Sequence, residues 1–557
     1  MSRRAFRLLS SLILSASLLL RYFVQPAPLY GATHDDELMV RLASSILKGN
    51  WLGNYTDLGH LTLSKPAGYP LFLAWTHFLP WAPTVTVHLL LLTGIVLIAR
   101  ELRSLGIGRS AIFLFITLSA FHPQWFGSQM SRIYRDGFLV ALTFLGIGLS
   151  LQLGRLVAER KTLREEGIGG VVRLLLIASL SGLVISWMIA TKPGWYPLGA
   201  VMVLFSVRRL LYWRNWNWRF WLPRISCAGI AALVGVASIV GYVSSQNKSH
   251  YGLFQLDSFS TGTFPDALSK WSSVESNDAR KYILVDASQR KRVYEVSETA
   301  RRLKPYLELS WGNGWRGSAC SSPVQICDES SAWFAWDLRD AMRSAGLDNS
   351  AKQFESSFAQ LENDIASACR SKKLKCNGNS LAPGLIPLSE ISKREFLDAN
   401  STAFDWILFS DVGSTVRGGA TTLDPKLLAV WDSTVRGLPT RAVLNVYRPE
   451  ATSLGNTILL LQKLFNVIWP LLFIFSLMSL VALRKGREIR MISIISFVGA
   501  LLFVAQIALL EASSGMYLTI GKQLYLLPVF PFIILLMSTE ASRVFSVFRE
   551  RVDNLKK

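Results

Sequence analysis

The stretch THDDELMVRLASSILKGNWLGNYTDLGHLTLSKPAGYPLFLAW, residues 33–75, is the most informative part of the chain. It places three consecutive acids, Asp35–Glu37, between two strongly apolar segments. From Leu38 the apolar residues recur at i, i+4 and i+8, the spacing of a helix with one apolar face. Such a helix lies along a membrane surface rather than across the bilayer. The sequence therefore predicts an interfacial helix with acidic residues at its start.

The same acids have an ordinary structural explanation. Thr33 followed three residues later by Asp36 is a capping pattern, and Gly49 is suited to end the helix. The carboxylates would then lie at the positive end of the helix dipole, where acids are common for stability alone. The pattern by itself leaves a helix cap and a functional pair of acids as equal alternatives.

The composition is that of an integral membrane protein. Half of the 557 residues are hydrophobic, and several apolar runs reach about twenty residues, the length that crosses a bilayer. The first run follows the basic start MSRRAFR as in a signal peptide, but no small-x-small cleavage site follows closely, so we expect a retained span. The ten expected spans are residues 6–24, 84–101, 110–126, 136–155, 170–190, 193–210, 223–243, 457–483, 489–510 and 522–541.

Basic residues orient these spans. If the short apolar run 68–80 is interfacial, every basic cluster falls on one side of the membrane, whereas counting it as a span would place Arg100–Arg109 outside. The positive-inside rule therefore favours ten spans with both termini cytoplasmic and the long segment 244–456 on the outer side.

The segment 244–456 is too polar to span and too long for a loop, so we expect a small folded domain, either α+β or mainly helical. An N-terminal membrane module, 1–243, with its first outer loop at 25–83, precedes it, and further spans within 457–557 follow. The outer segment holds about 25 Lys and Arg against about 24 Asp and Glu, so nearly all of the net charge of +21 belongs to the membrane part. This charge orients the protein, and nucleic acid is not expected as a partner.

Four of the five cysteines lie in the outer segment, in two closely spaced pairs, whereas Cys227 falls within an expected span and is interpreted as a packing residue. Two local disulfides are the natural expectation in an oxidising compartment. The sequence does not separate the three connectivities, and a four-cysteine zinc site remains an alternative. The residues concerned are Cys320, Cys327, Cys369 and Cys376.

The features of residues 33–75 together resemble the first outer loop of the GT-C glycosyltransferases, polytopic enzymes that take sugars from polyprenyl-phosphate carriers. The resemblance is to the bacterial branch with the lipid A aminoarabinose transferases, the Rgt-type transferases and the protein mannosyltransferase-like proteins. Its acid pair, Ala-containing helix, Gly-x-Trp and Lys-Pro turn with a nearby Tyr are met by Asp35–Glu37, Ala43, Gly49–Trp51 and Lys65–Pro70. Ala67 stands where family members often have a second proline.

The resemblance implies a GT-C-like polytopic α-helical fold and an inverting transfer of a hexose or pentose from polyprenyl (undecaprenyl) phosphate to a glycan, lipid or protein acceptor. It also implies a multi-pass protein of the bacterial inner membrane, in contact with membrane lipids, with its large loop in the periplasm. Monophosphate donors in this family generally need less metal help than diphosphate donors. A divalent metal is therefore compatible with the resemblance but not required by the sequence.

Glycosyl transfer needs a base for the acceptor hydroxyl and positive charge for the leaving phosphate. The family's first-loop aspartate is the base, which here is Asp36 or Asp35, and Asp36 is preferred because Asp36-Glu37 matches the Asp-Glu form of the motif. For the acid and the lysines at span ends, an interfacial anchor is the structural alternative. The expected substrate-binding residues are Glu37, Lys65, Tyr69, Arg132, Arg135, Asp136, Lys192 and Lys522.

Two other classes of function remain open. A transporter or flippase of lipid-linked sugars should show charged or Gly/Pro-broken segments near mid-bilayer and an internal repeat, and neither is clear in this sequence. A non-catalytic envelope assembly protein would keep its function without Asp35 and Asp36.

Overall fold

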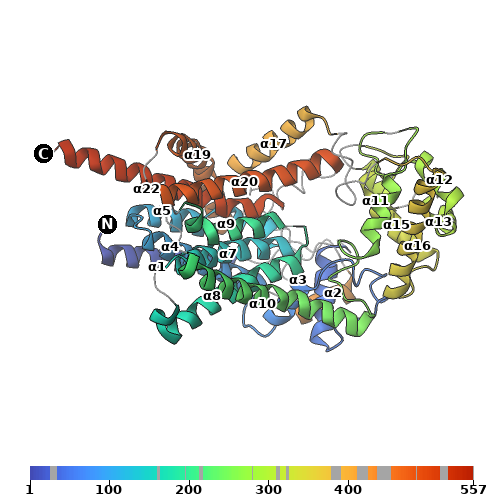
Figure 1. Ribbon diagram of the computed structural model, residues 1–557, viewed down its shortest axis with the longest axis horizontal. Helices are drawn as coiled ribbons and strands as arrows, with labels where there is room; N and C mark the ends of the chain where they lie inside the picture. Colours follow the sequence, from blue (N-terminus) through green and yellow to red (C-terminus); the bar gives the residue numbers. More distant parts are fainter. Residues whose placement is uncertain are drawn as a thin grey trace.

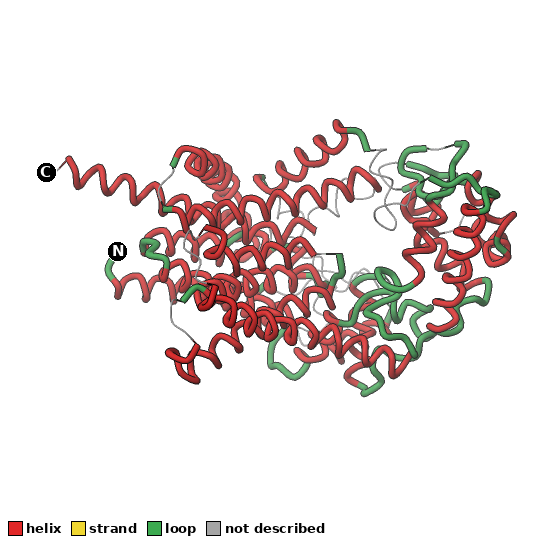
Figure 2. Tube along the Cα trace, viewed as in Figure 1, coloured by secondary structure: helices red, strands yellow, loops and turns green. Residues whose placement is uncertain are grey.

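In the computed structural model of the protein, the described residues form helices joined by loops, with no strand among them (Figure 2). A single antiparallel bridge joins Val274 and Cys376 within the described part. The structure describes residues 1–24, 34–159, 163–194, 196–212, 218–278, 280–308, 314–321, 325–377, 391–409, 424–435, 453–483, 486–514 and 525–555.

Eight of the described helices are long and apolar enough to cross a membrane. They confirm the expectation of a polytopic helical membrane protein, and they lie together at the end of the molecule that carries both termini (Figure 1). The eight helices are α1 (Arg3–Phe23), α4 (Pro83–Ser104), α7 (Arg135–Val157), α8 (Leu163–Thr191), α10 (Trp218–Tyr251), α19 (Ser453–Ala482), α20 (Arg487–Ser514) and α22 (Phe530–Leu555).

Two further expected spans correspond to shorter helices, α5 (Arg109–Ala120) and α9 (Tyr196–Tyr212). The expected span 110–126 was too long at its end, because α5 stops before Phe121 and a short 3-10 helix, η1 (Pro123–Phe126), follows. Pro123 has no N–H to continue an α-helical hydrogen-bond ladder. A second 3-10 turn, η7 (Leu527–Val529), leads directly into α22.

Close helix packing at glycines holds the membrane part together. Helix α7 is the central element, buried along nearly its whole length and packed against α4, α8 and α9. A Cβ at Gly94 of α4 would lie 2.6 Å from the backbone of Phe144 and Leu145 on α7. Small residues that let helix backbones approach closely are typical of membrane helix interfaces.

The first loop contains the predicted surface helix, α2 (Asp36–Leu47), and the short apolar helix α3 (Gly68–Thr76). Gly49 ends α2 with a φ of +76°, as the sequence predicts. At nine residues, α3 measures about 14 Å and is too short to cross a bilayer. Helix α2 packs against α3 and against α18 (Pro425–Thr434), so protein rather than membrane covers part of its apolar face.

The segment between α10 and α19 is called the insert below. Its part 263–370 lies at the opposite end of the molecule from the termini, whereas α17 (Lys393–Leu408) packs on α20 (Figure 1). Its described residues are helical, which settles the open choice between an α+β and a mainly helical domain for this part. The expected boundary after residue 243 falls within α10, which continues to Tyr251. The insert helices are α11 (Thr263–Ser272), α12 (Ala287–Val296), α13 (Glu298–Leu307), α14 (Gly314–Cys320), η2 (Ser331–Trp333), α15 (Phe334–Ser344), α16 (Ala351–Arg370), α17 (Lys393–Leu408) and α18.

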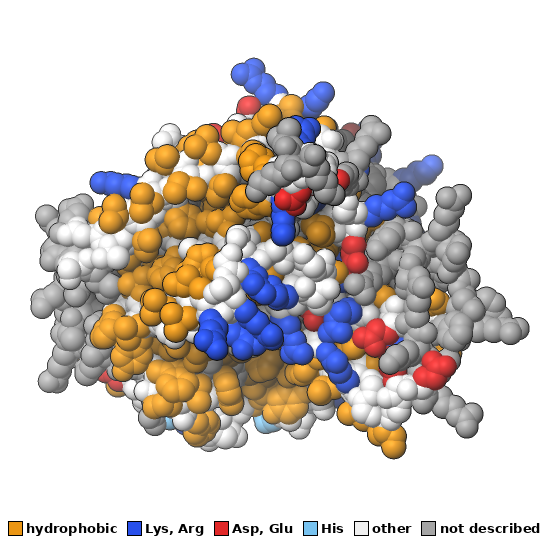
Figure 3. Space-filling model, turned by 90° about the vertical axis from the view of Figure 1, so that its left-hand side faces the viewer, with side chains coloured by type: hydrophobic (Ala, Val, Ile, Leu, Met, Phe, Trp, Pro, Cys, Tyr) orange, Lys and Arg blue, Asp and Glu red, His pale blue; other side chains and the backbone are white. Residues whose placement is uncertain are grey.

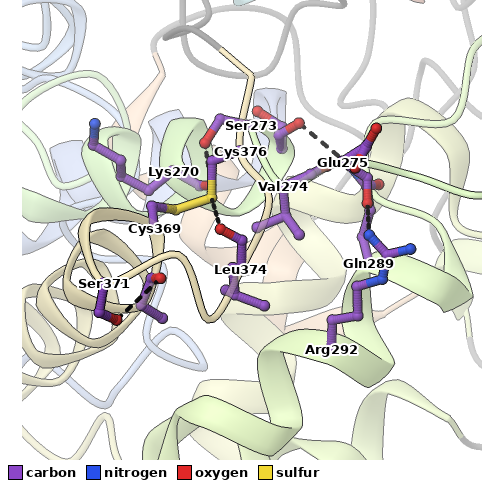
Figure 4. Close-up of a disulfide and its surroundings, with 12 residues drawn as sticks. Lys270, Ser273, Val274, Glu275, Gln289, Arg292, Cys369, Ser371, Leu374 and Cys376 are labelled. Carbon is purple, nitrogen blue, oxygen red and sulfur yellow. Dashed lines mark hydrogen bonds between the residues drawn. A yellow bond between two sulfur atoms is a disulfide. The ribbon is translucent and has the colours of Figure 1, made fainter.

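Two disulfides cross-link the insert. The structure pairs Cys320 with Cys327 and Cys369 with Cys376, so these sulfurs are not arranged as a four-cysteine zinc site. Figure 4 shows the second pair beside the bridge to Val274, where Gln289 of α12 donates to the Val274 carbonyl at 2.6 Å. The disulfide fastens the end of α16 to the residues that follow it, and backbone hydrogen bonds join these residues to the segment that follows α11.

Direct hydrogen bonds attach the insert and the end of α10 to the first loop. Trp51 Nε1 donates to Asn247 Oδ1 of α10 at 2.8 Å, and the Tyr55 hydroxyl donates to Asp348 Oδ1 at 2.5 Å. Arg343 of α15 donates to the carbonyl of Gly59 at 2.8 Å. The loop that carries the acids is thus held from two sides.

Candidate functional site

Segments far apart in the sequence meet at the end of the membrane helices nearest to α2 and α3 (Figure 1). The two aspartates lie at the start of α2, and Lys65 lies in the loop before α3. The segment 132–136 starts α7, Lys192 follows α8, and Tyr525 precedes η7. These expected outer ends of spans therefore form one cluster of side chains.

Asp35 belongs to a triangle of polar groups with Lys65 and Tyr134. Lys65 Nζ forms a short ion pair with Asp35 Oδ1 and donates to the Tyr134 hydroxyl at 3.2 Å. The Tyr134 hydroxyl donates to the same Asp35 oxygen at 2.9 Å. Lys65 is buried, whereas the Asp35 side chain is 40% exposed and remains open to a ligand.

Asp36 has a different environment from its neighbour. Arg132 binds it in a bidentate manner, with Nε to Oδ2 at 3.1 Å and Nη2 to Oδ1 at 2.5 Å. The Asp36 side chain is only 1% exposed. A bidentate guanidinium fixes the plane of a carboxylate, so Asp36 holds Arg132 in place from inside the protein.

These contacts bear on the helix-cap alternative. Asp35 occupies the N-cap position of α2, but its side chain makes no capping hydrogen bond. Both aspartates instead point to cations that come from other parts of the chain. The described contacts therefore do not support a role limited to capping; Thr33, the other member of the capping pattern, lies outside the described residues.

A third carboxylate, Asp136, lies fully buried at the start of α7. Lys192 Nζ donates to Asp136 Oδ1 at 2.8 Å and lies 3.7 Å from the centre of the Tyr525 ring. Arg135 donates to the Thr191 carbonyl at 3.5 Å and lies 5.4 Å from the centre of the Tyr134 ring. Among the described residues, Arg135 forms no ion pair with a carboxylate, and its Nε is buried without a hydrogen-bond partner.

Burial and charge together set the protonation of the site. Burial alone would raise the pKa of Asp35, but the charge of Lys65 and hydrogen bonds from Lys65 and Tyr134 hold that pKa below its usual range. Burial lowers the pKa of Lys65 to about 8, although Asp35 opposes this shift. Burial likewise lowers the pKa of Lys192 to about 7, against the charge of Asp136.

No protein-family model and no curated protein matches this chain. Two solved structures match it over 96% of its length and 77% of theirs. Both are of ArnT from Cupriavidus metallidurans: the apo state is 11% identical with a TM-score of 0.33, and the state bound to undecaprenyl phosphate is 12% identical with a TM-score of 0.32. Scores this low decide neither the fold nor the activity of this chain.

Three expected substrate-binding residues make no ion pair with the cluster or lie outside the described part. Glu37 pairs with Arg41 one turn along α2, at 2.7 Å. Tyr69 is buried, with its ring centre 6.1 Å from that of Phe138, and the charges of Asp36, Asp136 and Arg132 act on its hydroxyl. Lys522 lies outside the described residues.

The sequence analysis did not select Tyr134 or Tyr525, although both contact the cations of the cluster. The sequence carries a local signal at Tyr525, which begins a Tyr-x-x-Pro pattern within an apolar run. The described residues contain no group of three or more His, Cys, Asp and Glu side chains arranged to hold a metal ion.

Proposed function

We propose that this protein is a GT-C-type inverting glycosyltransferase of the bacterial inner membrane. It moves a monosaccharide from a polyprenyl-phosphate carrier to an acceptor on the periplasmic side. The motif of residues 33–70 and the geometry of the cation cluster support this proposal. The position of the cluster, at one end of the membrane helices, suits a donor whose phosphate lies at the membrane surface.

The balance of charge in the cluster carries the proposal. Four cations, Lys65, Arg132, Arg135 and Lys192, face three carboxylates, and three ion pairs use one cation each. Arg135 is the cation left without a carboxylate among the described residues. A partly buried guanidinium that forms no ion pair is stabilised further when an anion binds it directly, and a phosphate suits its donor geometry.

We assign the base to Asp35 rather than to Asp36, the residue preferred from the motif. Asp35 is 40% exposed and Asp36 only 1%, so Asp35 is the one within reach of an acceptor hydroxyl. The ion pair with Lys65 makes Asp35 a weak base before the donor binds. When a phosphate takes over the charge of Lys65, the pKa of Asp35 rises toward its usual value and its basicity increases.

The reaction then follows from these positions. The acceptor oxygen attacks the anomeric carbon as the carbon–oxygen bond to the phosphate breaks, and the acceptor proton passes to Asp35. The phosphate leaves with the bonding electron pair, and Lys65 and Arg135 stabilise its negative charge. Attack from the face opposite the phosphate inverts the anomeric configuration.

Equilibrium binding of polyprenyl phosphate to the full chain in nanodiscs tests the phosphate site, with the matching polyprenol as the ligand control. We expect the phosphate to bind at least tenfold more tightly than the alcohol, and Arg135→Gln to remove most of that difference. Arg173→Gln, which changes an exposed arginine on α8, is the matched control and should bind as the wild type does. Equal affinity for the phosphate and the alcohol would contradict the proposal.

A further inference from the structure

A polar cleft of about 400 Å³ lies between the first loop and helix α15 of the insert. Its volume falls within the range of about 300–1,000 Å³ that is usual for small-molecule sites. Both sides of the contact between loop and insert contribute to its walls. The lining residues that carry charge are Glu37, Arg41, Asp57, Asp340 and Arg343, and His34 lies among them.

Four of the five charged residues in the cleft are arranged in two pairs. Glu37 accepts from Arg41 at 2.7 Å, and Asp340 lies 3.3 Å from Arg343. The walls therefore alternate acceptors and donors with little net charge. Such an array suits a ligand rich in hydroxyl groups, because each hydroxyl both donates and accepts a hydrogen bond. An anionic ligand would instead meet three carboxylates, including Asp57.

Aromatic rings support the cleft from the side of the insert. The His34 ring lies 4.8 Å from the centre of Trp336 and 5.2 Å from that of Trp315. The two tryptophan rings are stacked, with centres 5.7 Å apart, and Trp315 Nε1 donates to Asp340 Oδ2 at 2.6 Å. Both rings are partly exposed. These rings pack against one another and against Phe259 and Trp333, so they form a rigid support behind His34 and Asp340, the residues that line the cleft.

The cleft adjoins the aspartate assigned as the base. His34 immediately precedes Asp35, Glu37 follows it by two residues, and consecutive Cα atoms are about 3.8 Å apart. Building on the proposed function, we propose that this cleft binds the acceptor and that the acceptor is a saccharide. The insert then selects the acceptor, while the membrane helices hold the donor phosphate.

Saccharide binding in the absence of donor tests this assignment. The full chain in nanodiscs is examined by saturation-transfer NMR with a panel of free disaccharides of hexoses, hexosamines and pentoses. A second arm presents sugars as the headgroups of glycolipids in the nanodisc, which separates a soluble acceptor from a lipid-linked one. We expect at least one disaccharide or glycolipid to bind, and Asp340→Asn and Asp57→Asn each to weaken that binding at least fivefold.

Asp328→Asn is the matched control, because Asp328 is an exposed insert aspartate that is also paired with an arginine, at 2.6 Å from Arg280. Its saccharide affinity should equal that of the wild type, and thermal unfolding should show that all three variants are folded. Absence of saccharide binding in both arms, or equal binding by wild type and Asp340→Asn, would overturn the assignment. Saccharide binding without any preference for polyprenyl phosphate over polyprenol would instead contradict the proposed transfer and leave the saccharide site standing.

Discussion

Two adjacent aspartates at the start of α2 have contacts that suit them to different tasks. Asp35 accepts hydrogen bonds from Lys65 and Tyr134 and faces the open part of the site. Asp36 is buried and accepts two hydrogen bonds from Arg132. The peptide at Asp35 has a φ of −123° and a ψ of −105°, outside the helical region, which sends its side chain away from that of Asp36. Two neighbouring residues thus differ in exposure: the carboxylate of Asp35 is accessible and that of Asp36 is buried.

Lys65 is expected to give phosphate binding a pH dependence. Burial lowers its pKa to about 8, so it loses its proton, and with it the charge that attracts phosphate, as the pH rises through this value. The affinity for polyprenyl phosphate should therefore fall from about pH 7 to about pH 9. Binding titrations across this range measure the effect.

Lys65→Arg is the variant that isolates this effect, because an arginine stays protonated throughout the range. Lys192, with a pKa of about 7, titrates in both proteins and does not affect the difference between them. The decline above about pH 8 should disappear in Lys65→Arg. The same decline in both proteins would show that another group controls phosphate binding.

At the scale of elements, the contact between α8 and α10 depends on glycines. A Cβ at Gly235 of α10 would lie 2.2 Å from the carbonyl oxygen of Ser179 on α8, whereas a Cβ at Gly229 meets nothing within 4 Å. We expect Gly235→Ala to destabilise the protein by about 1–3 kcal/mol, because one of the two backbones must move. Thermal unfolding of the solubilised protein measures this change.

Gly229→Ala, on the same helix, is the matched control for Gly235→Ala. It adds the same methyl group in open space, so its effect should be neutral or slightly stabilising, as alanine favours a helix over glycine by about 1 kcal/mol. Equal effects of the two substitutions would mean that α8 and α10 do not pack as described.

The bond between Tyr55 and Asp348 makes the attachment of the insert sensitive to pH. Burial raises the pKa of Asp348 to about 7, although the hydrogen bond from Tyr55 opposes the shift. The folded state thus binds this proton more tightly than the unfolded chain, whose aspartate titrates near about pH 4. The contribution of Asp348 to stability is therefore present at low pH and lost as the pH rises toward about 7.

Asp348→Asn should remove this contribution while keeping an oxygen that accepts from Tyr55. His60 lies 3.6 Å from Asp348 and has a pKa lowered by burial, which gives the opposite slope, but it is present in both proteins. Raising the pH from about 5 to about 7 should therefore lower the unfolding midpoint of the wild type relative to that of the variant. Identical differences in the two proteins would contradict this account.

At the scale of the whole molecule, the distribution of charge predicts the orientation in the membrane. Lys and Arg side chains gather on the face at the end that carries both termini (Figure 3). The positive-inside rule places this end in the cytoplasm and the insert, with its two disulfides, in an oxidising compartment. In this predicted orientation the site opens on the outer side, as the proposed function requires.

Labelling of single cysteines in a Cys227→Ser background tests this orientation. Asn363 on α16 and Arg549 near the end of α22 are both exposed, so cysteines there should accept a membrane-impermeant maleimide. We expect Asn363→Cys to react in intact spheroplasts and Arg549→Cys only after permeabilisation. The reverse pattern would place the site in the cytoplasm.

Much of the fold could be predicted from the length of the apolar runs and from the Gly and Pro residues that end helices. The long membrane helices and the end of α2 at Gly49 depend on the residues of one segment each, so the sequence of that segment is enough to predict them. Arg132 and Arg135 could be selected from the sequence because basic residues at outer span ends run against the positive-inside trend. The disulfide pairs, likewise, join neighbours in the sequence.

Contacts set by tertiary packing were not predictable in the same way. The choice between Asp35 and Asp36 depends on one backbone conformation and on partners 30 and 96 residues away. Helix α18 packs against α2, and Tyr525 contacts Lys192. Both contacts join segments that are still farther apart in the sequence. Neither periodicity nor motif spacing contains this information.

Sugar transfer by Asp35→Asn and Asp36→Asn, with a panel of polyprenyl-phosphate monosaccharides, tests the central claim most directly. Asp35→Asn should lower the rate by about 100- to 10,000-fold, the usual contribution of a general base, while the affinity for polyprenyl phosphate stays near that of the wild type. Asp36→Asn should keep measurable transfer, because its carboxylate positions Arg132 and does not meet the acceptor. Wild-type rates in Asp35→Asn, or complete loss in a folded Asp36→Asn that still binds donor, would contradict the assignment of Asp35 as the base.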